Sequence, residues 1–140
     1  MRRLRNQRGA ALIETAITIP MVLLVSVAIF EFGRAYQTWQ VLTNAAREGA
    51  RVAILSDSTD AQVSAAVRDY MTAGRISNAA AAPVVVERTV PLGANTSSRV
   101  TINYPFNFMV IGPVARLVTG TSTLGNSLTM TAVALMRNES

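Results

Sequence analysis

One unbroken apolar stretch near the N-terminus constrains this chain more than any other feature. Residues Ala10 to Phe30 contain a single charged side chain, Glu14. In an α-helix with a rise of about 1.5 Å per residue, a stretch of this length extends about 30 Å, which is the thickness of the hydrocarbon core of a bilayer. The stretch therefore predicts one membrane-spanning helix with a lipid bilayer as its surroundings.

The basic residues are distributed asymmetrically around this stretch. The formal net charge is +5, and most of it comes from four arginines that precede the stretch: Arg2, Arg3, Arg5 and Arg8. A basic segment before an apolar helix stays in the cytoplasm, so we expect the residues after Phe30 to lie outside the membrane. Because the charge is a short N-terminal block rather than a patch on a folded surface, it gives no support to nucleic-acid binding.

Two alternatives to a processed membrane anchor remain open. A secretory signal peptide also has a basic start and an apolar stretch, and Ser26-Val27-Ala28 is similar to a small-residue cleavage site, so signal peptidase would release a secreted domain near Ala28. The length of the apolar stretch and the acid near its start argue against this. The other alternative is an uncleaved, membrane-anchored interaction module of the envelope.

Glu14 is unusual because a carboxylate costs about 2.5–3.5 kcal/mol at the middle of a membrane helix on insertion scales, and less near the ends. Glu14 lies one turn into the apolar stretch. Solvation by the headgroups is one explanation of its presence. The other is a function, because an acid within a membrane helix is a candidate functional residue.

The residues around Glu14 resemble the N-terminal signal of type IV pilins and pseudopilins. A basic leader ends in Arg8-Gly9, and Ala10-Ala11-Leu12-Ile13-Glu14 follows. The resemblance implies that a prepilin peptidase cuts between Gly9 and Ala10 on the cytoplasmic side and leaves the apolar helix attached. Glu14 of one subunit would then pair with the new α-amine at Ala10 of a neighbour and set the register of the assembly, because a buried carboxylate is tolerated when it is paired.

The helical pattern continues beyond the apolar stretch. Small and apolar residues recur at alternating intervals of four and three, which predicts one packed face of a continuous helix to Leu55. The members of this face are Ala28, Phe32, Ala35, Trp39, Leu42, Ala46, Gly49 and Ala53. Tyr36 and Trp39 also suit an aromatic anchor at the membrane surface. Pro20 and Gly33 are the weak points of this helix.

Two further segments resemble the TadE-like proteins of tight-adherence (Flp, type IVc) pilus-assembly systems. They are Glu31-Phe32-Gly33-Arg34 and Asn44-Ala45-Ala46-Arg47-Glu48-Gly49-Ala50-Arg51, and with the leader they span about Arg8 to Leu55. Tyr104-Pro105-Phe106 also fits this family. The resemblance implies a minor pseudopilin that acts in the assembly or priming of an adhesive pilus. Its partners would be the prepilin peptidase, other pilins and pseudopilins, and the inner-membrane assembly platform.

The remaining sequence predicts a small α+β domain. Asp60 is expected to cap a second helix that ends at Gly74. Segments 84–90, 99–106 and 127–137 have the β-branched or alternating pattern of strands. We therefore expect a roughly three-stranded antiparallel sheet packed on the long helix, as in pilin-like proteins.

Two details of the domain carry separate expectations. Val133 and Leu135 place apolar side chains on the second face of the last strand, so this half of the strand should be covered on both sides, by the domain itself or by a partner. Residues 106–118 are apolar but too few to span a bilayer. They are expected to pack on the sheet or touch the membrane surface.

We therefore expect three parts: a leader at 1–9, a transmembrane helix at 10–33 and an extracytoplasmic domain at 34–140. The location would be the bacterial inner membrane, with a single pass, or the pilus after extraction from that membrane. The chain has no cysteine and no histidine, and its acids are scattered. These features remove thiol nucleophiles, cysteine metal sites and the commonest general base. We expect no enzyme activity, cofactor or metal.

Overall fold

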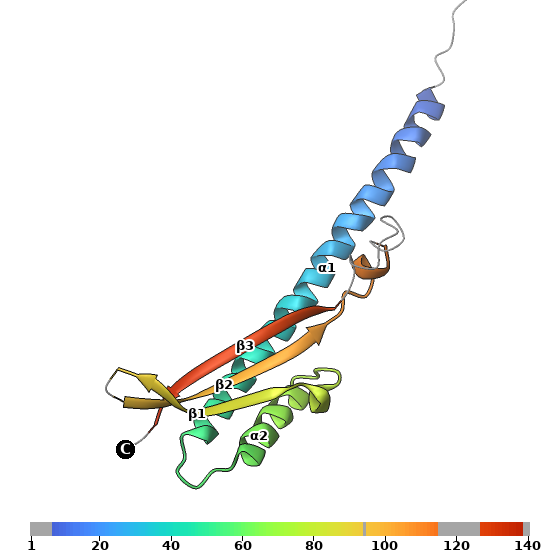
Figure 1. Cartoon of the computed structure of the whole chain (residues 1–140). Helices are drawn as coiled ribbons and strands as arrows, with labels where there is room; N and C mark the ends of the chain where they lie inside the picture. The colour runs from blue at the N-terminus through green and yellow to red at the C-terminus, as the bar shows by residue number, and fades with distance from the viewer. Residues whose placement is uncertain (1–6, 94, 115–126, 139–140) are drawn as a thin grey trace, which may run out of the picture.

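The computed structural model describes residues 7–93, 95–114 and 127–138 (Figure 1). It is an α+β fold, as predicted, with one long helix, a second helix and a three-stranded antiparallel sheet. The elements are α1 (Gln7–Ala53), α2 (Asp60–Ala73), a 3-10 turn η1 (Ala79–Ala81), β1 (Val84–Leu92), β2 (Asn95–Phe106) and β3 (Leu128–Arg137).

The sheet has the order β1-β2-β3, with β2 in the centre. Val100 of β2 pairs with Val86 of β1 and with Ala134 of β3. Successive side chains of a strand point to opposite faces, and one row of β2 is buried: Val100, Ile102, Tyr104 and Phe106. This row packs against the second half of α1, which lies along the sheet in Figure 1.

The first half of α1 projects away from the domain (Figure 1). The helix is long and apolar enough to cross a membrane, and none of the residues in its most apolar 18-residue window is buried by the described part of the chain. The helix passes through Pro20 without ending there. A contiguous exposed apolar surface of this size marks a protein or membrane interaction site. The predicted apolar helix is therefore present, and the described residues do not bury its most apolar part.

Just after the apolar stretch, two members of the packed face of α1 lie one residue earlier than predicted. Ala35, Leu42, Ala46, Gly49 and Ala53 are buried as predicted, whereas Phe32 and Trp39 are exposed. Their places are taken by Glu31 and Thr38. The same spacing of three and four fits either row, and the predicted row is the one without a charged residue.

Gly49 lets α1, α2 and the sheet approach one another closely. A Cβ atom added at Gly49 would lie 2.5 Å from Cγ2 of Val67 on α2 and 3.3 Å from Cγ1 of Val100 on β2. Both valines are fully buried. The β-branched side chain of Val67 has little rotamer freedom in a helix, so it has no easy way to move aside.

Gly49→Val should therefore lower the free energy of unfolding by about 1–3 kcal/mol, the usual cost of overpacking a core. Gly33→Val is the matched control, because a Cβ at Gly33 has no heavy atom within 4 Å. Valine has a higher helix propensity than glycine, so the control should be neutral or slightly stabilising. Urea unfolding of both variants in detergent micelles measures the difference. Equal stabilities would show that α2 does not pack against Gly49.

The second helix begins one residue earlier than predicted. Its N-cap is Thr59, whose side chain accepts from the Gln62 N–H, while the Gln62 side chain accepts from the Thr59 N–H at 2.8 Å. This reciprocal arrangement is a capping box. Asp60 is the first helical residue rather than the cap. Gly74 follows the helix as predicted, and its N–H donates to the Tyr70 carbonyl oxygen.

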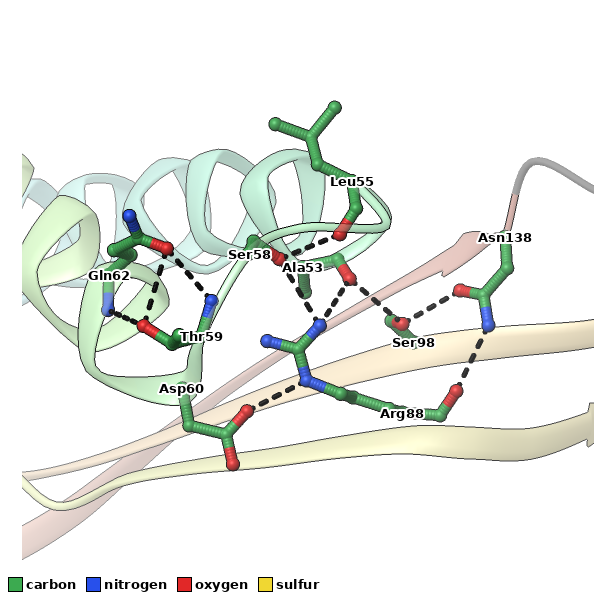
Figure 2. A network of polar contacts seen from close by, with 9 residues as sticks. All are labelled: Ala53, Leu55, Ser58, Thr59, Asp60, Gln62, Arg88, Ser98 and Asn138. Carbon is green, nitrogen blue, oxygen red and sulfur yellow. Dashed lines mark hydrogen bonds and ion pairs between the residues drawn. The ribbon is translucent and has the colours of Figure 1, made fainter.

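A polar network centred on Arg88 closes the end of the domain opposite the apolar half of α1 (Figures 1 and 2). A register shift in β1 between Glu87 and Val90 inserts an extra residue opposite β2, which redirects side chains locally. Arg88 donates to Oδ1 of Asp60 at 2.8 Å and to the carbonyl oxygen of Ala53 at 3.0 Å. The network thus joins β1 to the end of α1 and the start of α2.

Asn138 extends this network to the sheet and the C-terminal strand (Figure 2). Its Nδ2 donates to the Arg88 carbonyl oxygen at 3.0 Å, and its Oδ1 accepts from the Ser98 hydroxyl at 2.7 Å. Because Asp60 accepts a hydrogen bond from Arg88 in this network, it is engaged in a structural contact and is not a free acid.

The outer face of β3 is not covered by the described part of the domain. Val133 and Leu135 are both exposed, whereas their neighbours Ala132 and Ala134 are buried. The described part of the domain therefore does not cover this face, because α1 packs on one face of the sheet only; of the two expected covers, a partner remains.

Candidate functional site

The described part of the chain buries one carboxylate, that of Glu31, which follows the apolar stretch directly. Glu31 is only 1% exposed. The two oxygens of Glu31 accept from the backbone N–H of Met109 at 2.9 and 3.0 Å, and Oε1 also accepts from the N–H of Val110 at 2.9 Å. A buried charge is tolerated when it is paired and hydrogen-bonded. The loop after β2 provides most of that pairing.

Arg34 completes this junction from the next turn of α1. Its Nη2 donates to Oε2 of Glu31 at 3.3 Å and to the carbonyl oxygen of Asn107 at 2.5 Å. The guanidinium carbon lies 4.5 Å from the centre of the Phe106 ring, within the range of a cation–π interaction. Glu31 and Arg34 therefore hold successive residues of the loop against the same face of the helix.

Aromatic contacts continue the junction around α1. The rings of Phe106 and Phe108 meet edge to face at 5.2 Å, and those of Phe32 and Phe108 at 6.0 Å. Such edge-to-face pairs are favourable arrangements. Glu31-Phe32-Gly33-Arg34 is thereby joined to the end of Tyr104-Pro105-Phe106, two motifs that lie far apart in the sequence. The sequence prediction identified both motifs but not their contact.

The Glu31 carboxylate also lies at the start of a helical turn. Residues 111–114 are helical, and the N–H of Val114 donates to the Val110 carbonyl oxygen at 3.1 Å. A carboxylate is favourable at such an N-terminal end, where backbone N–H groups lack partners. The segment after Phe106 therefore packs beside α1, while Met109, Val110 and Val114 remain exposed. Residues 115–118 of the predicted apolar segment lie outside the described residues.

The structure places Glu14 far from this junction, on the projecting half of α1. Its side chain is exposed and has no hydrogen bond or ion pair with the described residues, although its carbonyl oxygen accepts from the Thr18 hydroxyl at 2.8 Å. Gly9 and Ala10 are also helical. Arg2, Arg3 and Arg5 lie outside the described residues, as does the side chain of Arg8.

The second motif on α1 serves the packing of the domain. Its small residues form the surface on which α2 and the sheet rest, and they are buried: Ala45, Ala46, Gly49 and Ala50. Arg47 is exposed, Asn44 is half-buried, and Glu48 pairs with Arg51 at 3.5 Å on the surface. A surface ion pair of this kind contributes little to stability.

The described residues contain no group of three metal-ligating side chains. Glu87, another of the scattered acids, forms an exposed pair with Arg99 at 3.1 Å. The candidate functional features are therefore the exposed apolar half of α1, with Glu14 on it, and the Glu31 junction at its end.

A comparison with protein families finds a match that lies within α1. Residues 9–51 match the model of the TadE-like protein family. The matched segment contains Glu14 and both motifs on α1, so the resemblance predicted from the sequence is confirmed there; α2 and the sheet lie outside it. No curated protein and no solved structure matches the chain.

Proposed function

We propose that this chain is a minor pseudopilin of a tight-adherence (type IVc) pilus system, anchored by α1 in the bacterial inner membrane. The observation that carries the proposal is the construction of α1. One uninterrupted helix has an apolar first half, whose most apolar 18-residue window contains no buried residue, and a second half that contributes to the domain core. The family match spans both halves, so the similarity to a pilus-associated family includes the anchor.

The N-terminus would face the cytoplasm and the domain would lie outside, in line with the arginines before the apolar stretch. The protein would have no catalytic activity. It would act in the assembly or priming of an adhesive pilus through contacts with other pilins and pseudopilins, the inner-membrane platform and the lipid bilayer. Extraction into the pilus is compatible with such a role.

A prepilin peptidase would cut between Gly9 and Ala10. The cut would leave a positive α-amine at Ala10, one helical turn from the Glu14 carboxylate. Glu14 has no partner among the described residues of its own chain, and an unpaired carboxylate is costly in a membrane. The amine of a neighbouring subunit would supply the missing charge.

The two alternatives differ from this proposal in the N-terminus of the mature protein. Release of a secreted domain requires a cut near Ala28. The length of the apolar stretch and the acid near its start favour an anchor over a secreted domain. An uncleaved anchor would retain Met1.

Glu14→Ala tests the assembly role. Breaking a buried charge pair costs about 3–5 kcal/mol, which corresponds to a weakening of subunit association by more than about 100-fold. Pilus output should therefore fall sharply, while cutting between Gly9 and Ala10 continues. Surface pili and the mass of the processed chain are measured in the parent bacterium. Glu48→Ala is the control, because Glu48 lies on the same helix in an exposed pair. Normal pilus output from Glu14→Ala would contradict the pairing.

A further inference from the structure

We infer that residues 107–114, the described segment after β2, form a second membrane contact that rests on the same bilayer that α1 spans. Its contact surface is an apolar rim formed by Phe32, Phe108, Met109, Val110 and Val114. Phe32 is 63% exposed and Met109 is 69% exposed, while Val110 and Val114 are each 44% exposed. The inference rests on the membrane anchoring proposed above, but it does not depend on pilus assembly.

The position of the rim along α1 is set by hydrogen bonds. The apolar stretch ends at Phe30, and Glu31 binds the N–H groups of Met109 and Val110. Phe32 lies only about 3 Å beyond Phe30 along the helix axis. The turn at 111–114 lies beside α1 beyond the end of β2, on the side from which the apolar half projects (Figure 1). The rim is therefore at the level where the helix leaves the hydrocarbon.

The charges at this level are compensated inside the protein. Glu31 and Arg34 would each resist contact with lipid if they were exposed and unpaired. Instead, Glu31 is buried, and Arg34, whose side chain is 31% exposed, donates to both Glu31 and the Asn107 carbonyl oxygen. The same carboxylate satisfies two backbone N–H groups of the loop, and unsatisfied backbone groups are costly wherever water is excluded. The junction thus allows the non-helical residues 107–110 to lie at the membrane surface.

Lipid is the partner of the rim because the rim is continuous with the exposed apolar surface of α1. Ile29 and Phe30 are each 70% exposed, and the exposed side chain of Phe32 follows them on α1. Phe32 in turn contacts Phe108 of the loop. Tyr36 is exposed about 9 Å beyond Phe30 along the helix, a position that suits an aromatic side chain among the headgroups. The rim extends the lipid-facing surface sideways from the helix to the domain.

The absence of cysteine from the chain allows a direct test with single labels. Met109→Cys and Val114→Cys place an environment-sensitive fluorophore on the rim, and the Glu31 hydrogen bonds remain because Met109 contributes its backbone. Val22→Cys, within the apolar stretch, reports whether α1 is inserted. Leu55→Cys, exposed in the turn that follows α1, is the aqueous control. The full chain is reconstituted in vesicles of phosphatidylethanolamine and phosphatidylglycerol with lipid-borne quenchers, or with iodide on both sides.

We expect lipid-borne quenchers near the headgroups to act on the labels at 109 and 114, deep quenchers to act on the label at 22, and iodide alone to act on the label at 55. Iodide quenching at 109 and 114 equal to that at 55, with position 22 inserted, would overturn the second contact and leave the anchor intact. Protection of the rim that disappears when the protein is diluted in lipid would assign it to a second copy instead. Failure of lipid quenching at 22 would overturn both proposals.

Discussion

Replacing Glu31 with alanine should lower the free energy of unfolding of the domain by about 3–5 kcal/mol, because the buried carboxylate accepts two backbone hydrogen bonds and each hydrogen bond to a charged group contributes about 1.5–3 kcal/mol. The substitution leaves the N–H groups of Met109 and Val110 without their acceptor and Arg34 without its carboxylate. A small domain has about 5–15 kcal/mol of stability in total. A large fraction of the fold's stability therefore depends on one side chain at the end of the apolar stretch.

Urea unfolding of the full chain in detergent micelles measures this effect. Trp39 is the only tryptophan and lies on the domain half of α1, so its fluorescence reports on the domain. Glu48→Ala is the matched control: the same substitution in the same helix removes only an exposed pair with Arg51, which is worth at most about 1 kcal/mol. A Glu31→Ala protein as stable as the Glu48→Ala protein would show that the loop is not held by this carboxylate.

Much of the architecture could be predicted because it follows from local pattern. The apolar stretch, the alternation in β2 and the glycine after α2 each have a signal within a few residues of sequence. The capping box of α2 also had such a signal, since Thr59 and Gln62 have the required spacing. Asp60, one residue later, is also a favoured cap residue, so the predicted cap lies one position too late.

The junction at Glu31 could not be predicted because its partners are distant in sequence. A charged residue in a row of helical positions normally indicates the exposed side, so the pattern predicts a packed face through Phe32 and Trp39. Glu31 is buried only because the backbone of Met109 and Val110, 78 and 79 residues away, supplies the donors. The contact between the motifs at 31–34 and 104–106 depends on tertiary structure alone.

Gly9→Val should block processing of the N-terminus almost completely. Glycine has no side chain and lets a protease approach the backbone closely, whereas valine places a branched side chain at the scissile bond. Gly33→Val is the control, since it makes the same change in the same helix at a position with open space. The control should be processed as the wild type. Efficient cutting of the Gly9→Val chain after residue 9 would contradict the assigned cleavage site.

The intact mass of the wild-type protein, taken from membrane and soluble fractions of cells with an active prepilin peptidase, tests the central claim most directly. The account predicts a membrane-bound chain that begins at Ala10. A chain that still begins at Met1 would identify an uncleaved anchor, and a soluble chain that begins near Ile29 would identify a secreted domain. Either of these results would contradict the assignment as a processed pseudopilin.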